Sequence, residues 1–331
     1  MIGYYAHHVG QGHLRRALAI AAASSHPFTL LSSLERPAGY DGAWVQLPRD
    51  DTAEDATDPT AFGQLHWAPV GDAGLRARMA LIAEWIHTAR PSAMVVDVSS
   101  EVIAFARLMG VRVITLLQPG SRADPAHQLG YALADELIAP WPESIGADLV
   151  DGTQAWTAKM RFTGAFSRFD GRAPIPRSTA RPRVVLLHGQ GGTTLTTPDV
   201  TAARAATPDW DWTILGHDPQ GWVEDPWPVL SGADVVITHA GLNAVAEVAA
   251  ARKPAIILPQ PRPHDEQLTT ARTLAHAGLA VALERWPPAH EWPGLLCIAL
   301  RAGGGRWPLW STGDGAARAA AIIEASSRSC R

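Results

Sequence analysis

The chain has 331 residues, of which 47% are hydrophobic, and a formal net charge of −4. This length and composition predict a globular protein with two domains of about 150 residues each, and the slight acidity gives no sign of a surface for nucleic acid. Cys297 and Cys330 are too few for a disulfide framework or a zinc knuckle. Because no apolar run approaches the ~20 residues that span a bilayer and the first residues lack a signal-peptide pattern, we expect a cytoplasmic protein that is neither secreted nor membrane-spanning.

The first half of the chain alternates strand and helix patterns. It opens with an expected strand over 2–6, a loop over 7–12 and an alanine-rich helix over 13–23. Further strands are expected over 28–31, 93–98, 111–116 and 136–139, with helices over 75–88 and 101–109. Alternation of this kind favours a parallel sheet. The segment 50–74, rich in Asp, Thr, Pro and Gly, is predicted to be a long loop, and such loops tend to carry function.

The second half repeats this opening after a break. Prolines and arginines with little periodicity between 164 and 183 predict a domain boundary. A strand over 184–187, a glycine-rich loop over 188–194 and a helix over 198–206 then follow. Later strands are expected over 212–215, 234–237, 255–258 and 279–283, with helices over 243–251, 265–277 and 315–326.

These patterns predict an α/β protein of two Rossmann-like, doubly wound domains that face a central cleft. We expect a first domain over residues 1–165, a linker over 166–182 and a second domain over 183–310. The last residues, 311–331, are expected to form a helix that closes the chain and can pack back on the first domain.

The most informative motif is Thr-His-Ala-Gly-Leu-Asn-Ala-Val-Ala-Glu over residues 238–247. It follows a β-branched strand and begins an alanine-rich helix, so it presents unpaired N–H groups and a positive dipole end that suit a phosphate. Glu247, about one helical turn further on, is placed to reach a ribose hydroxyl. The alternative is an ordinary βα unit in which His239 caps the helix and Glu247 is solvated.

Two other segments strengthen the phosphate interpretation. The loop His-Gly-Gln-Gly-Gly-Thr-Thr over 188–194 lies between a strand and a helix, where glycines allow backbone N–H groups to approach an anion closely. It lacks the Lys-Ser/Thr pair of a P-loop, and a tight turn without a ligand is the alternative. In 259–267, a proline-stiffened loop leads into Asp265, Glu266 and Gln267; we favour sugar hydroxyls as ligands of Glu266 and Gln267, and a role in the first helical turn for Asp265.

These three segments, in this order, resemble the C-terminal half of GT-B glycosyltransferases. Residues 239–247 resemble the signature of UDP-glycosyltransferases and the equivalent region of MurG-type N-acetylglucosaminyltransferases, and the likeness extends over 184–283. It implies that His239, Gly241 and Asn243 lie at the phosphates, that Glu247 holds the ribose, and that Glu266 and Gln267 bind the donor sugar. It also places Gly191, Gly192 and Thr193 in a phosphate loop and Trp222 and Val223 at the uracil. Ala244 departs from the usual serine.

The same resemblance directs attention to the first turn, Gly-Gln-Gly-His-Leu-Arg-Arg over 10–16. In this family the Gly-His pair faces the cleft, so Gly12 would contact the acceptor and His13 would be a general base. An imidazole with an ordinary pKa of about 6.5 can accept a hydroxyl proton at neutral pH. Asp97, at the end of a strand, is a candidate to orient His13; capping the following helix is the equal alternative. A helix-start residue that donates to backbone is the alternative for His13.

The acceptor side is less well defined. His8 and Trp67 are candidate acceptor contacts, Trp67 because it lies in the long loop and can stack on a ligand; most of the thirteen tryptophans are expected to be core residues. The resemblance implies a nucleotide-sugar donor such as a UDP-sugar, an acceptor that is a small molecule or lipid-linked, no cofactor, no metal and no nucleic acid. A MurG-like protein would also contact the inner face of the membrane peripherally, but the arginines alone do not establish such a surface.

Together these features predict an inverting, metal-independent glycosyltransferase. The Gly-x-Gly-His-x-x-Arg pattern that ends at Arg16 also resembles PseG-type nucleotide-sugar hydrolases, in which His13 would activate water. A non-catalytic nucleotide-sugar-binding protein is the alternative outside enzymes. An epimerase of the same fold would need further acid and base carboxylates, for which the sequence offers no clear set.

Overall fold

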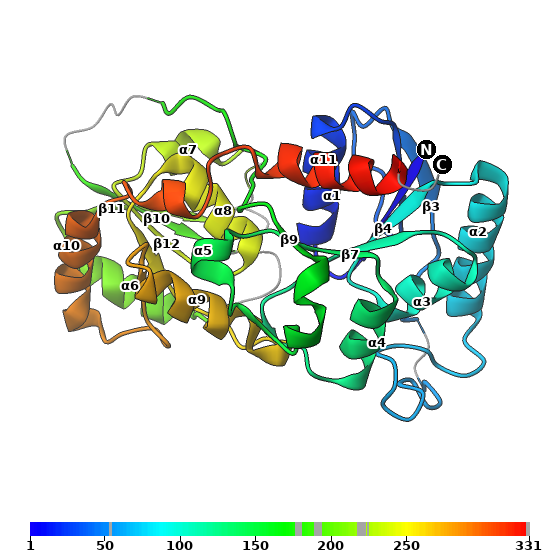
Figure 1. The fold of residues 1–331 in the computed structure, drawn as a ribbon. Helices are drawn as coiled ribbons and strands as arrows, with labels where there is room; N and C mark the ends of the chain where they lie inside the picture. Colours follow the sequence, from blue (N-terminus) through cyan, green and yellow to red (C-terminus); the bar gives the residue numbers. More distant parts are fainter. Residues whose placement is uncertain (53–54, 176–180, 189–193, 217–222, 224, 329–331) are drawn as a thin grey trace. The chain divides into compact units, whose positions relative to one another are not determined.

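The computed structural model describes residues 1–52, 55–175, 181–188, 194–216, 223 and 225–328. It divides into two compact units, each with its own parallel sheet (Figure 1). Unit 1 comprises Met1–Pro140, Val150–Thr163 and Ala316–Arg331, and unit 2 comprises Trp141–Leu149 and Gly164–Gly315. Compared with the expected limits, Trp141–Leu149 falls in unit 2 instead of the first domain, and the segment expected to be a linker belongs to unit 2.

Unit 1 is built around a seven-stranded sheet in the order β3-β2-β1-β4-β5-β7-β9. Its strands, all paired in parallel, are β1 (Ile2–Ala6), β2 (Phe28–Ser32), β3 (Ala43–Gln46), β4 (Ala93–Asp97), β5 (Val113–Leu116), β7 (Glu136–Ala139) and β9 (Met160–Phe162). The helices are α1 (Gly12–Ala23), α2 (Ala73–Ala89), α3 (Ser100–Leu108), α4 (Pro125–Leu133), η1 (Gln154–Lys159) and α11 (Gly315–Arg328). Two short strands, β6 (Gly120–Ser121) and β8 (Val150–Asp151), pair separately.

The core of unit 1 follows from the apolar runs of its central strands. Side chains of β1, β2, β4 and β5 pack against the buried faces of α2 and α3, with Ile82, Val102 and Ile103 among them. The last helix joins this unit: Glu324 of α11 accepts hydrogen bonds from the Ser24 and Ser25 hydroxyls just after α1, and Figure 1 shows α11 and α1 beside each other.

Unit 2 contains a five-stranded parallel sheet in the order β11-β10-β12-β13-β14. Its strands are β10 (Arg183–Leu187), β11 (Asp211–Leu215), β12 (Val235–Thr238), β13 (Ala255–Ile257) and β14 (Val281–Ala282). The helices are α5 (Glu143–Gly146), α6 (Thr197–Ala206), α7 (Trp227–Ser231), α8 (Leu242–Ala251), η2 (Pro263–Asp265), α9 (Glu266–His276), η3 (Ala289–Glu291), α10 (Trp292–Ala302) and η4 (Trp307–Leu309). One core cluster joins β10, β12 and β13 to α6 and α10, including Trp292, Leu296 and Val200.

The strand order of each unit reverses once, and this creates the places where side chains can gather around a ligand. In unit 1 the chain runs outward from β1 to β3 and then returns to the other side of β1 with β4; in unit 2 the reversal lies between β10 and β12. Ligands of doubly wound sheets bind beyond the carboxyl ends of the strands at such reversals. The fold is thus α/β with parallel sheets in two Rossmann-like units.

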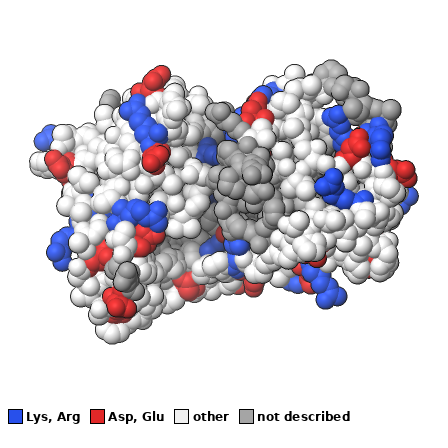
Figure 2. All heavy atoms as spheres, turned by 180° about the vertical axis from the view of Figure 1, so that it is seen from behind, with Lys and Arg blue, Asp and Glu red and all other residues white. Residues whose placement is uncertain are grey.

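The distribution of surface charge and the length of the apolar helices can both be described from the structure. On the face shown in Figure 2, basic and acidic side chains are scattered in small groups of both signs. Within the described part of the chain, no helix is both long enough and apolar enough to cross a bilayer.

Candidate functional site

The strand reversal of unit 1 brings His13 and Asp97 together. Ala6, at the end of β1, pairs in register with Asp97 at the end of β4. The loop after β1 turns at Gly10, whose φ of 79° suits glycine, and α1 begins at Gly12. His13 therefore lies in the first helical turn, directly beyond the carboxyl ends of the two central strands. Its Nδ1 is 2.9 Å from Asp97 Oδ1.

Arg16 completes this cluster from the next turn of α1. Its Nε lies 3.1 Å from Asp97 Oδ2 and its Nη2 lies 2.8 Å from Oδ1, so the guanidinium grips the carboxylate in a bidentate pair. The Tyr4 hydroxyl of β1 donates to Asp97 Oδ2 at 3.1 Å. Asp97 is fully buried and Arg16 is 6% exposed.

These contacts decide which nitrogen of His13 carries the proton. Arg16 Nη2 lies 2.8 Å from His13 Nδ1 as well, but a guanidinium can only donate. Its two hydrogens are taken by Asp97 Oδ1 and by the Gln118 amide oxygen, which lies 2.7 Å away in the amide orientation that satisfies both groups. The Nδ1 proton of His13 therefore donates to Asp97, and Nε2 retains the lone pair that a general base needs.

The charge of Asp97 is stable in this environment. Burial alone would raise the pKa of its carboxyl, but the charge of Arg16 and the hydrogen bonds of His13 and Arg16 outweigh burial and hold the pKa well below the usual value. Burial beside this carboxylate raises the pKa of Tyr4 well above its ordinary value, so the phenol stays protonated and donates. The next residue, Val98, has a φ of 55°, a left-handed conformation that is strained for a β-branched residue.

The predicted acceptor residues have structural contacts of their own. His8 is buried, with Nε2 3.2 Å from Asp51 Oδ2 and Nδ1 3.4 Å from Arg78 Nη2, so it belongs to a buried polar cluster around Arg78. Trp67 is partly buried and its indole N–H donates to the Asp50 carbonyl at 2.6 Å. Gly12 begins α1, beside His13.

The strand reversal of unit 2 brings together all three segments that the sequence singled out. His188 follows β10 and His239 follows β12, and their ring centroids are 5.6 Å apart. Gln267 Oε1 accepts from Ala240 N at 3.2 Å and from Gln260 N at 2.9 Å. Gln260 Oε1 in turn accepts from Thr194 N at 2.6 Å. The end of the glycine-rich loop, the start of α8 and the start of α9 are therefore neighbours.

The start of α8 has the geometry expected of an anion site. Gly241 is the N-cap in an extended conformation and makes no side-chain cap, so the first N–H groups of the helix have no acceptor within it. Asn243 lies in this first turn. His239 Nδ1 is 3.1 Å from the Leu258 carbonyl, and because a carbonyl only accepts, Nδ1 carries the ring proton.

Glu247 is buried, which contradicts the alternative in which this carboxylate is solvated. It is 5% exposed and its Oε1 lies 3.0 Å from Arg168 Nε. Arg168 was not identified from the sequence, because it lies in the irregular arginine-rich segment that precedes β10. Gln267 likewise has a structural role through its oxygen, while Glu266 opens α9 and is half-buried.

The remaining residues of the predicted donor site fall partly outside the described part of the chain. Gly191, Gly192, Thr193 and Trp222 lie outside the described residues, while Val223 is described and exposed. Tyr4 and Gln118 are further members of the His13 cluster that the sequence did not indicate. Arg16 was visible as the arginine three residues after His13, a spacing that places both on one helix face.

Comparisons with known proteins agree with this geometry. Residues 222–285 match the glycosyltransferase family 28 C-terminal domain. The chain is 40% identical over 86 residues to the UDP-N-acetylglucosamine--N-acetylmuramyl-(pentapeptide) pyrophosphoryl-undecaprenol N-acetylglucosamine transferase of Nitratidesulfovibrio vulgaris (strain DP4), an alignment over 23% of this chain and 24% of that protein. The match thus spans about a quarter of the length of this curated relative.

Two solved structures share the fold over nearly the whole chain. The glycotransferase of kitacinnamycin has a TM-score of 0.69 at 18% identity and covers 98% of each chain. The MurG of Acinetobacter baumannii has a TM-score of 0.65 at 16% identity and covers 98% of this chain and 99% of that one. Over nearly its whole length the chain therefore has the same GT-B fold as these two proteins, and residues 222–285 are similar to the family 28 C-terminal domain.

Proposed function

We propose that this chain is an inverting, metal-independent glycosyltransferase that moves a sugar from a nucleotide diphosphate, best a UDP-sugar, to an acceptor hydroxyl or amine. The observation that carries the proposal is the His13 cluster. The Asp97 carboxylate accepts a hydrogen bond from His13 Nδ1, and Arg16 and Tyr4 donate to its remaining lone pairs. His13 Nε2 is then the nitrogen that can act as a base.

The residues divide the reaction between them. His13 Nε2 would take the acceptor proton while the acceptor atom forms a bond to the anomeric carbon, and the bond from that carbon to the diphosphate oxygen breaks. The departing diphosphate gains negative charge, which the N-terminus of α8 and the glycine-rich loop would stabilise. This electrostatic role takes the place that a divalent cation has in other transferases.

The donor assignment rests on unit 2. His239 and the first turn of α8 would hold the diphosphate, Glu247 the ribose, and Glu266 with Gln267 the sugar. When ribose binds, either the ion pair between Arg168 and Glu247 would break, or the Glu247 carboxylate would contact both Arg168 and the ribose. The acceptor is a small molecule or a lipid-linked molecule. If it is lipid-linked, the protein would work at the inner face of the membrane.

A first experiment measures donor binding by thermal shift with UDP-, dTDP- and GDP-sugars, because a ligand that binds the native state raises the melting temperature. We expect the largest rise with a UDP-sugar. His13→Ala should keep this rise, since His13 is not assigned to the donor. Absence of a rise with every nucleotide sugar would refute the proposal.

A second experiment measures UDP release with and without a pool of alcohol and amine acceptors. We expect release that depends on acceptor, and a fall of about 10²–10⁴-fold in His13→Ala, with His87→Ala, an exposed histidine on α2, as the matched control. Equal release without acceptor would favour the hydrolase suggested by the Gly-x-Gly-His-x-x-Arg pattern. Binding without any release would favour a nucleotide-sugar-binding protein.

A further inference from the structure

A second cluster of ligating side chains lies in unit 1, at the start of α4. Asp124 is the N-cap of this helix, and its Oδ1 accepts from His127 N at 3.1 Å. The Asp124 Oδ2 atom lies 2.5 Å from His127 Nδ1. Residues three apart share a helix face, so the first turn of α4 offers a carboxylate and an imidazole to the same point.

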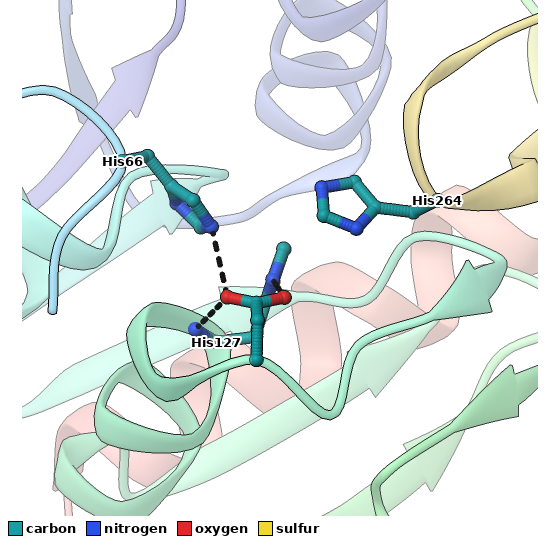
Figure 3. Close-up of side chains that lie close together, drawn as sticks. His66, His127 and His264 are labelled. Atoms are coloured by element: carbon teal, nitrogen blue, oxygen red, sulfur yellow. Dashed lines mark hydrogen bonds and ion pairs between the residues drawn. The ribbon is translucent and has the colours of Figure 1, made fainter. Parts of the chain in front are cut away.

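A third side chain is brought to this point from the long segment before α2. His66 Nε2 lies 3.2 Å from Asp124 Oδ1, and the rings of His66 and His127 are 4.4 Å apart. Figure 3 shows both rings turned toward one carboxylate. Helix capping explains the contact between Asp124 and His127, but it does not explain why a loop residue is added to them.

The segment that carries His66 is held in place by hydrogen bonds from its backbone. Glu101 Oε1 accepts from His66 N at 2.7 Å and from Trp67 N at 3.0 Å. The Trp67 indole is fixed by the Asp50 carbonyl on the other side. The His66 side chain is 38% exposed, so the cluster has buried support beneath it and an open side toward solvent.

We propose that His66, Asp124 and His127 bind a divalent transition-metal ion, best Zn²⁺. The candidate ligand atoms lie within 4.8 Å of one another, which small side-chain rotations would bring to the bond lengths of a tetrahedral site. Two imidazoles and one carboxylate are donors that zinc accepts, whereas Mg²⁺ and Ca²⁺ prefer oxygen.

The charges of the cluster agree with such an ion. Burial lowers the pKa of His127 to about 4, so this imidazole is neutral at pH 7 and can offer a lone pair. Burial would raise the pKa of Asp124, but the hydrogen bonds from His127 lower it to about 2, so the carboxylate is charged. Arg122 Nη1 lies 3.4 Å from His127 Nε2. If His127 binds the metal through Nδ1, its ring proton lies on Nε2 and faces the Arg122 guanidinium, which is also a donor. Because two donors then face each other, the affinity for zinc should be weaker than that of a closed four-ligand zinc site.

The other group of similar side chains in the described part of unit 1 does not carry the same inference. His8, Asp50 and Asp51 also lie close together. Arg78 Nη1, however, is 2.6 Å from Asp50 Oδ2, so a buried guanidinium already neutralises this carboxylate and would repel a second cation.

The test is a zinc titration of tag-free protein against a chromophoric chelator, with Co²⁺ absorption as a report on coordination by nitrogen. We expect one equivalent bound and a loss of affinity of at least about tenfold in His66→Ala and in His127→Asn. His87→Ala is the matched control and should bind zinc as the natural protein does. His66→Ala is the cleaner variant, because its exposed side chain leaves the cap of α4 intact.

Two results would overturn the proposal. One is the absence of stoichiometric zinc binding by the folded natural protein. The other is binding of equal affinity in the natural protein and His66→Ala. Neither result depends on turnover, so the outcome is separate from that of the proposed transferase activity.

Discussion

At the scale of single residues, the most unusual group is a carboxylate that is fully buried yet charged. Asp97 receives a bidentate pair from Arg16, a hydrogen bond from Tyr4 and one from His13. Four donors saturate the lone pairs of a carboxylate. The same contacts that keep Asp97 ionised fix the tautomer of His13, so stability and the proposed base are coupled through one side chain.

This coupling predicts the behaviour of Arg16→Gln. The substitution leaves Asp97 buried without its cation, and we expect the free energy of unfolding to fall by about 3–5 kcal/mol. The double variant Arg16→Gln/Asp97→Asn should recover much of this loss, because it buries no uncompensated charge. Urea denaturation measures both, with Arg15→Gln on the same helix as a control that should lose far less. A double variant less stable than Arg16→Gln alone would contradict the explanation.

His239 predicts a pH dependence of donor binding. Burial is the main cause that lowers the pKa of His239 below its ordinary value of 6.5, so the free ring is neutral above that pH. Its one proton points to the Leu258 carbonyl. A phosphate oxygen also needs a donor, so a phosphate at Nε2 requires a second proton, and binding takes up H⁺.

The affinity for a UDP-sugar should therefore fall as pH rises, by up to about tenfold per pH unit between pH 7 and 8. Titration calorimetry at several pH values measures this, with a UDP-sugar in place of UDP because a terminal phosphate itself titrates near pH 6. His239→Gln, whose amide donates without titrating, should bind with little pH dependence. Equal affinity of the natural protein at pH 7 and pH 8 would argue against a phosphate at Nε2.

At the scale of elements, the N-terminus of α8 carries Ala244 where the signature that residues 239–247 resemble has a serine, and this serine can be introduced. Ala244 is the third residue of the helix and is half-buried, so a serine hydroxyl fits there. If the diphosphate lies at this terminus, Ala244→Ser adds one hydrogen bond worth about 0.5–1.5 kcal/mol, or roughly a two- to tenfold lower Kd for the UDP-sugar. Ala244→Val, which adds bulk without a donor, is the control. A Kd that serine and valine change alike would count against the assignment.

The elements also show how far the sequence alone could go. Buried parallel strands such as β4, β10 and β12 were predicted almost to the residue, because their apolar runs, rich in valine, are flanked by turn residues. Four-residue β3 was missed, since it is a half-exposed edge strand with no clear pattern. Helices α4 and α10 were also missed, although both begin with Pro in the first turn, a recognised start signal.

In the candidate site, too, local sequence patterns predicted some residues and not others. His13 and Asp97 were predicted as partners because a helix start and a strand end of one sheet edge must meet, and the structure brings them together. Tyr4 and Gln118 were not predicted, because their positions depend on register between strands distant in sequence. Arg168 was not predicted because it lies in the irregular segment before β10, where no periodic pattern indicates what a side chain contacts. The roles assigned to these residues in catalysis and donor binding stay predictions.

At the scale of the whole molecule, the chain consists of two units that each place a candidate site at the strand reversal of their own sheet. In the proposed function, unit 1 supplies His13 as the base, and unit 2 supplies the phosphate-binding residues at the start of α8, beside His239, which donates to backbone. The proposed function thus assigns the donor chemistry to one unit and the acceptor chemistry to the other.

Hydrogen exchange tests this division in the intact protein. A UDP-sugar at 100 times its Kd stabilises the state that binds it by about 2.7 kcal/mol, or roughly 100-fold in the exchange of amides that require unfolding of that unit. We expect the largest slowing in peptides that cover β12, the start of α8 and the start of α9, and a smaller change in β1 and β4. His13→Ala should give the same pattern as the natural protein, because its side chain belongs to unit 1. Slowing confined to unit 1 would show that the donor binds where we place the acceptor, and the assignment of the two units would have to be reversed.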